Sequence, residues 1–87
     1  MVASGSYIIG MARSDENKTK ASLRYAGENM EADLRETIKE IIEKLKSGEF
    51  GGHKNAAGAI IPSDKEEEFI KISEEVLERK CMEEGIE

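Results

Sequence analysis

The feature that most constrains the fold is a helical repeat of apolar residues over residues 30–47. Apolar side chains recur there at three- and four-residue spacing: Met30, Leu34, Ile38, Ile41, Ile42 and Leu45. Asn29 is a suitable N-cap for this helix. Lys44 and Lys46 suit its last turn, and Gly48 can adopt the left-handed conformation that ends many helices. A helix with one apolar stripe must bury that stripe against a sheet or another helix.

Short apolar or alternating runs predict three strands, at residues 6–12, 19–25 and 56–61. The first two are joined by the polar segment RSDENK and are expected to form an antiparallel hairpin. Beyond the third strand, Ser63 and Glu66 match the capping-box pattern. A second amphipathic helix is therefore expected over residues 64–82.

These elements predict a small two-layer α/β domain with the order β-β-α-β-α. The strand at residues 19–25, the first helix and the strand at residues 56–61 form a candidate right-handed crossover, so a mixed sheet is expected. The polar side of the strand at residues 19–25 suggests that one sheet face is uncovered, with both helices on the other face. We expect residues 1–5 to be a tag or linker remnant, residues 6–82 to form the domain, and residues 83–87 to be a frayed tail.

Length and composition exclude several classes of protein. A chain of 87 residues suffices for one domain with a small core. Its single cysteine, Cys81, cannot form an internal disulfide and favours a reducing, cytoplasmic setting. No apolar run approaches the roughly 20 residues that span a bilayer, so no membrane association is expected.

The charge is unevenly distributed along the chain. The net charge is −6, which argues against a non-specific nucleic-acid binder. Residues 17–27 and 50–63, however, contain no acid and together carry +4, which leaves −10 on the remainder. A patch of one sign on an opposite background attracts anionic ligands. Chance clustering in a chain that is 37% charged is the alternative.

The segment GGHKNAAG at residues 51–58 has the composition of a phosphate-binding loop. The adjacent glycines Gly51 and Gly52 allow a ligand to approach backbone N–H groups. His53 and Asn55 add side-chain donors, and Lys54 adds positive charge. Neither standard nucleotide fingerprint is present. The alternative is a glycine turn with a histidine that hydrogen-bonds locally.

This segment resembles the G-G-G-H-x-x-A-A-G motif of the DHH-associated domain. That domain is the C-terminal half of RecJ-type exonucleases, nanoRNases and phosphoadenosine-phosphate phosphatases. The ASLR sequence at residues 21–24 is similar to the strand motif that precedes the helix in that family. The family often has a third glycine before the pair, and Phe50 stands at that position here. The resemblance extends over about residues 6–80.

The resemblance implies a substrate-binding role for the domain. His53 and the backbone of Gly51 and Gly52 would hold a phosphate of a nucleotide or short oligonucleotide. Arg24 would hold the neighbouring phosphate or the terminal nucleotide through its planar donor set. The resemblance further implies that Ser22 and Asn55 assist. Lys54 is expected to contribute general electrostatics.

The resemblance also implies an N-terminal DHH catalytic domain as partner, with two manganese or magnesium ions that activate a water. This chain has no Asp-His-His sequence and only one histidine. No cofactor is therefore expected here, and the chain by itself is expected to be inactive although its parent would be a hydrolase. The alternative function is a stand-alone RNA-binding module of the alanyl-tRNA-synthetase type. A structural or dimerisation module without a ligand is a third possibility.

Overall fold

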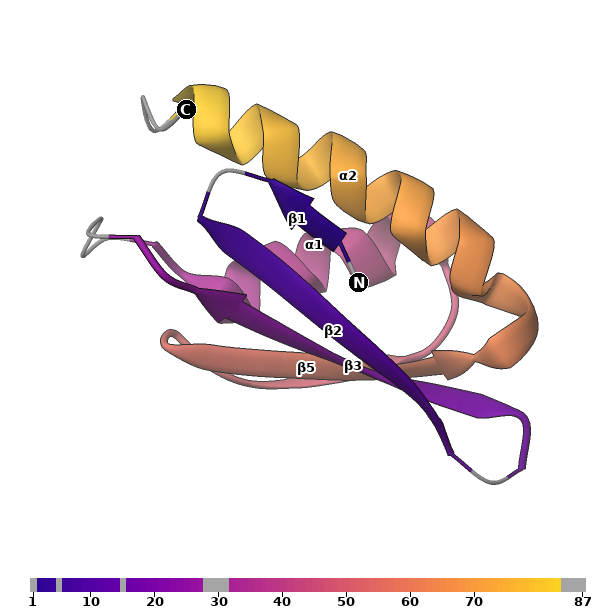
Figure 1. Cartoon of the computed structure of the whole chain (residues 1–87). Coiled ribbons are helices and arrows are strands. Elements are labelled where there is room, and N and C mark those ends of the chain that lie inside the picture. Colours follow the sequence, from indigo (N-terminus) through magenta and orange to yellow (C-terminus); the bar gives the residue numbers. More distant parts are fainter. Residues whose placement is uncertain (1, 5, 15, 28–31, 84–87) are drawn as a thin grey trace.

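The computed structural model describes residues 2–4, 6–14, 16–27 and 32–83. Five strands, one 3-10 turn and two helices make up this part of the chain (Figure 1). The strands are β1 (Val2–Ser4), β2 (Tyr7–Ser14), β3 (Lys18–Tyr25), β4 (Glu49–His53) and β5 (Ala56–Pro62). The helices are α1 (Leu34–Leu45) and α2 (Glu66–Glu83), with the 3-10 turn at Ser63–Lys65 before α2.

The strands form one sheet in the order β1-β2-β3-β5-β4, and both helices lie on the same side of it (Figure 1). The predicted two-layer α/β class with both helices on one face is thereby confirmed. The sheet is antiparallel at all four described pairings, so it is not the mixed sheet that the sequence favoured.

The expected crossover ends on a different strand. The segment at residues 56–61 is β5, and it runs antiparallel to its neighbour β3. Helix α1 instead connects β3 to β4, which are parallel to each other but separated by β5. The reason is a tight turn at Lys54 and Asn55, which folds β4 and β5 into a hairpin. The glycine segment is therefore mostly strand rather than loop.

The expected domain limits differ from the structure at the N-terminus. Val2–Ser4, within the supposed tag or linker remnant, pairs with β2 as an edge strand. Three residues give no periodic pattern, so only the pairing reveals this strand. At the other end, α2 includes Glu83, and the rest of the expected tail lies outside the described residues. In the part of the chain that the structure describes, neither helix has the length and apolar character needed to cross a membrane.

The helix ends also differ from the sequence expectation. Asn29 lies outside the described residues, and the N-cap of α1 is Asp33, whose carboxylate accepts from the Glu36 amide. The left-handed residue at the C-terminus of α1 is Lys46, with φ of 59°, and Gly48 follows with φ of 95°.

The predicted capping box before α2 is replaced by tertiary contacts. The Ser63 amide donates to the Asn17 carbonyl, 2.8 Å away. The Glu66 carboxylate accepts from Arg13, at 3.0 Å from Nε, and from the buried Thr19 hydroxyl. The hydrogen bonds from Arg13 and Thr19 outweigh the effect of burial and lower the pKa of Glu66. The start of α2 is thus attached to the β2–β3 hairpin.

The core lies between the sheet and the helices. Alternate residues of the central strands point into it: Tyr7, Ile9, Ala21, Leu23, Ala57, Ala59 and Ile61. The helices contribute Leu34, Ile38, Ile41, Ile42, Leu45, Phe69, Val76, Leu77 and Cys81. Because the sheet residues between these point away from the helices, one whole sheet face is left for other contacts.

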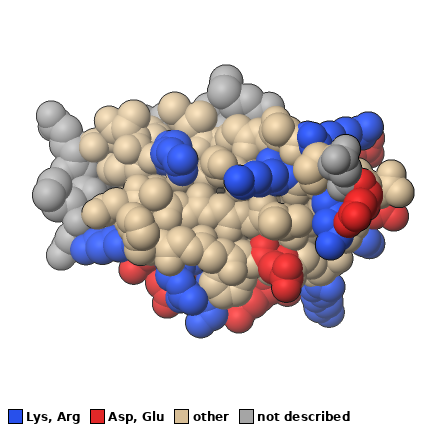
Figure 2. All heavy atoms as spheres, turned by 90° about the horizontal axis from the view of Figure 1, so that it is seen from below, with Lys and Arg blue, Asp and Glu red and all other residues tan. Residues whose placement is uncertain are grey.

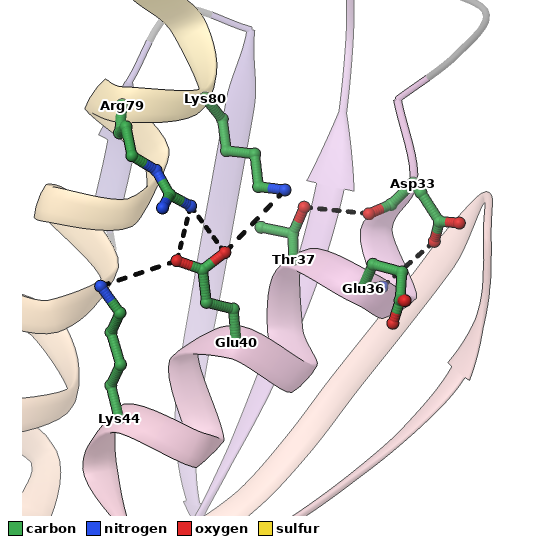
Figure 3. Close-up of polar contacts among 7 residues, drawn as sticks. All are labelled: Asp33, Glu36, Thr37, Glu40, Lys44, Arg79 and Lys80. Carbon is green, nitrogen blue, oxygen red and sulfur yellow. Dashed lines mark hydrogen bonds and ion pairs between the residues drawn. The ribbon is translucent and has the colours of Figure 1, made fainter. Parts of the chain in front are cut away.

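Glu40 of α1 joins the two helices through a cluster of basic side chains (Figure 3). Arg79 Nη2 of α2 lies 2.6 and 2.5 Å from the two carboxylate oxygens. Lys44 and Lys80 lie 3.6 and 4.0 Å away. Partial burial would raise the pKa of Glu40, but the Arg79 hydrogen bond and the charges of Arg79, Lys80 and Lys44 outweigh it and lower the pKa.

We expect Glu40→Gln to destabilise the fold at neutral pH by about 0.5–1 kcal/mol, since Arg79 and Lys44 are about half exposed. A carboxyl with a lowered folded pKa stabilises above its unfolded pKa of about 4.3, and this stabilisation is lost as the pH falls through the folded pKa. Urea unfolding from pH 7 to pH 3 should therefore show the difference from wild type shrinking below about pH 4. Glu43→Gln, on an exposed part of the same helix, is the control and should show no such trend.

Candidate phosphate-binding face

The uncovered sheet face carries an open hollow of about 630 Å³ over β3, β5 and β4. Its middle is a row of residues with little or no side chain. Ser22 of β3 pairs with Gly58 of β5, which pairs with Gly51 of β4. Gly10 of β2 pairs with Ser22 and extends this row beyond the hollow. We call the space above Ser22, Gly58 and Gly51 the glycine hollow.

Larger polar side chains border the glycine hollow at both ends. At one end, His53 of β4 pairs with Ala56 of β5, and Arg24 follows the last β3–β5 pair, between Leu23 and Ala57. The alternation of the strands therefore puts Arg24 and His53 on the same face, on either side of Ala56.

At the other end, Ile60 of β5 pairs with Lys20 of β3 and with Glu49 of β4. Lys20 and Glu49 thus stand on either side of an apolar side chain. The hollow has a basic end at Arg24, with His53 beside it in the sequence of strand pairs, and a mixed end formed by Lys20, Ile60 and Glu49.

The three glycines differ in what a side chain at each position would meet. Gly52 has φ of 118°, and a Cβ there would lie 2.4 Å from the Ala56 carbonyl oxygen and 2.6 Å from the Ala57 Cα. A Cβ at Gly58 would lie 2.7 Å from the Ala21 carbonyl oxygen. Both positions are fixed by the protein's own backbone. A Cβ at Gly51 would meet nothing within 4 Å, so its missing side chain leaves open space in the hollow.

The turn beside His53 is held by helix α1. The Lys54 carbonyl accepts a hydrogen bond of 2.9 Å from the Leu34 amide, in the first turn of α1. This bond satisfies an amide that a helix start leaves without an intrahelical partner. The turn at Lys54 and Asn55 is therefore fixed relative to the helix layer, although both side chains are exposed.

The structure brings together part of the residue set predicted from the sequence. Gly51, Gly52, Ser22 and Arg24 line the hollow. His53 is not among the lining residues and pairs with Ala56 next to the hollow, whereas Lys54 and Asn55 occupy the adjoining turn. The Arg24 guanidinium donates to the Leu23 carbonyl at 3.0 Å through Nη1.

The sequence analysis missed Gly58, Ile60 and Glu49 as lining residues. Their signal was the strand register: Gly58 pairs with the predicted residues Ser22 and Gly51, and Ile60 and Glu49 pair with each other two residues further along β5 and β4. That register becomes available only when β4 is identified as a strand.

Phe50 does not disturb the glycine pair that follows it. It pairs with Ala59 and is partly buried against the core, on the helix side of β4. The Arg35 guanidinium carbon lies 5.2 Å from the centre of its ring, within cation–π range. Tyr25 likewise packs against the core, with its ring centre 4.8 Å from that of Tyr7, on the same side of β3 as Leu23.

Basic side chains stand out on the uncovered face. Figure 2, which views the molecule from below the sheet, shows lysine and arginine side chains standing on a largely uncharged surface. Acidic residues in this view lie mainly along its margins. Among the described residues, no group of three or more His, Cys, Asp and Glu could hold a metal ion. The lysine and arginine side chains of this face offer donors and positive charge for an anion.

The family described as "DHHA1 domain" matches residues 3–79, which is most of the chain. The chain belongs to the DHHA1 domain family. This is the DHH-associated C-terminal domain of DHH-family phosphoesterases, so the domain is associated with that enzyme family. Such domains typically accompany an N-terminal DHH catalytic domain. Comparison with curated proteins gave no match.

Alanine substitution of each of the two adjacent glycines of this DHHA1 domain should show that neighbouring backbone constrains Gly52, whereas Gly51 faces open space. Gly52→Ala should lower the free energy of unfolding by about 1–3 kcal/mol, because it forces a Cβ into a positive-φ, backbone-crowded position. Gly51→Ala should change it by less than about 0.5 kcal/mol. Urea unfolding of both variants measures the difference, and equal stability would contradict this account of Gly52.

Proposed function

We propose that the domain binds the phosphates of a nucleotide or short oligonucleotide at the basic end of the glycine hollow, as the substrate-binding part of a DHH-family phosphoesterase. The observation that carries this proposal is the common face of Arg24 and His53, beside a backbone stripped of side chains at Gly51. A guanidinium and an imidazole are donors that suit phosphate, and the missing side chain at Gly51 leaves room for it.

The chemistry of hydrolysis would then belong to the partner DHH domain. Two divalent ions, manganese or magnesium, would activate the attacking water there. The present residues would orient the substrate by its phosphates, with Ser22 and Asn55 as further donors and Lys54 as nearby positive charge. RecJ-type exonuclease activity is one form that this division of labour takes in the family.

We expect a 5′-phosphorylated adenosine dinucleotide to shift the backbone amide resonances of Ser22, Arg24 and residues 51–53 of the full chain. Arg24→Gln should weaken this binding about tenfold, because it removes the charged, bidentate donor. His53→Ala should weaken it by a smaller factor. Lys71→Gln removes one positive charge from an exposed position on α2, in the opposite layer, and should change affinity by less than about twofold.

Two results would redirect the proposal. If those amides move with neither the dinucleotide nor inorganic phosphate in wild type, the domain is a structural module and not a ligand-binding one. If a hairpin RNA binds far more tightly than the dinucleotide, with a steep dependence on salt, the RNA-binding alternative is favoured. The −10 charge outside the two basic segments argues against a large RNA footprint.

Filling the hollow gives a second, independent check. Gly51→Val points a branched side chain into open space and suits a strand, so the variant should fold with wild-type stability or better. Dinucleotide affinity should nevertheless fall at least about tenfold by exclusion. Gly10→Val is the matched control, since Gly10 lies in the same row, has equal room, and does not line the hollow. Equal losses in the two variants would count against binding in the hollow.

A further inference from the structure

The mixed end of the glycine hollow has the form of a small platform. Ile60 is an exposed large apolar residue, with 43% of its surface accessible. It stands in the middle of the row, because Lys20 and Glu49 are its partners on the two neighbouring strands. A planar ligand group can lie with one face on such an apolar side chain. Its edges then contact the polar side chains on either side.

The polar ends of this platform are available to a ligand. Within the described part of the chain, neither the Lys20 ammonium nor the Glu49 carboxylate has a hydrogen-bonding or ion-pair partner. Two strand spacings put their backbones about 10 Å apart, with Ile60 between them. The row therefore presents a donor on one side and an acceptor on the other.

The distance between the two ends of the hollow suits one nucleotide unit. Along β3, Lys20 and Arg24 are four residues apart, which corresponds to about 13 Å in a strand. Long side chains at both ends shorten the span that a ligand must cover. Between them, Ser22, Gly58 and Gly51 leave room for a sugar. A ligand with its phosphate at Arg24 and His53 would thus place its base at Ile60.

Resting on the proposed phosphate site, we propose that Lys20, Ile60 and Glu49 form a base subsite that selects guanine. Guanine offers adjacent N1–H and N2–H donors, which match the two oxygens of one carboxylate, and O6 and N7 acceptors, which match an ammonium. Ile60 supports the ring face. A uracil ring lacks the exocyclic amino group, so it cannot satisfy Glu49 in the same way.

The test compares guanosine 5′-monophosphate with inosine 5′-monophosphate, which differs only by loss of the N2 amino group. Amide shifts of the full chain at residues 49–51 and 58–60 give the two dissociation constants. Guanosine monophosphate should bind wild type about tenfold more tightly. Glu49→Gln should reduce this ratio to about twofold or less, because the amide keeps only one acceptor oxygen. Glu43→Gln, with the same charge change on exposed α1, should preserve the ratio.

The outcomes separate the base subsite from the phosphate site. If both nucleotides bind wild type equally and shift Arg24 and residues 51–53, the base subsite is wrong and the phosphate site stands. If Glu49→Gln keeps the full guanine preference, selection lies elsewhere and the assignment of Glu49 is overturned. If neither nucleotide nor inorganic phosphate shifts any residue of the hollow, both proposals fail. The wild-type comparison decides the matter even if a variant does not fold.

Discussion

The two helices cover one face of the sheet and leave the other bare. Because successive side chains of a strand point to opposite faces, every second one lies in the core and those between lie on the bare face. In β3 this division separates Ala21 and Leu23, which are fully buried, from Ser22 and Arg24 on the bare face. The same residues that stabilise the fold thus fix the direction of those on the bare face. Ser22 is held by paired backbone on both sides of β3, and Arg24 by its pairing with Ile8 of β2.

The glycine segment contains two kinds of glycine: positions crowded by neighbouring backbone, and one position that faces open space. Gly52 and Gly58 lack side chains because neighbouring backbone occupies that space, whereas Gly51 lacks one although there is room. Only the second kind of glycine leaves open space for a ligand. In sequence the three are indistinguishable, and only the positive φ of Gly52 and the approach of Ala21 to Gly58 tell them apart.

Local periodicity made most of the fold predictable. The hairpin of β2 and β3, the helix α1 and the strand β5 all follow from apolar spacing, and so does the polar face of β3. Strand β4 could not be predicted this way, because Gly51 and Gly52 suppress any strand signal and its pairing with β5 is what stabilises it. Missing β4 led to the wrong crossover partner and hid Glu49 and Ile60. The Ser63–Glu66 pattern failed for another reason, since tertiary contacts with Arg13 and Thr19 compete for the same carboxylate.

The bond from the Leu34 amide to the Lys54 carbonyl connects the two layers of the domain at the turn between β4 and β5. A helix start usually obtains such an acceptor from its own flanking residues or from water. Here the acceptor belongs to the turn next to His53, so a displacement of that turn would leave the first amide of α1 without its partner. Hydrogen exchange at this single amide would therefore register movements of the turn, from a position within the opposite layer of the protein.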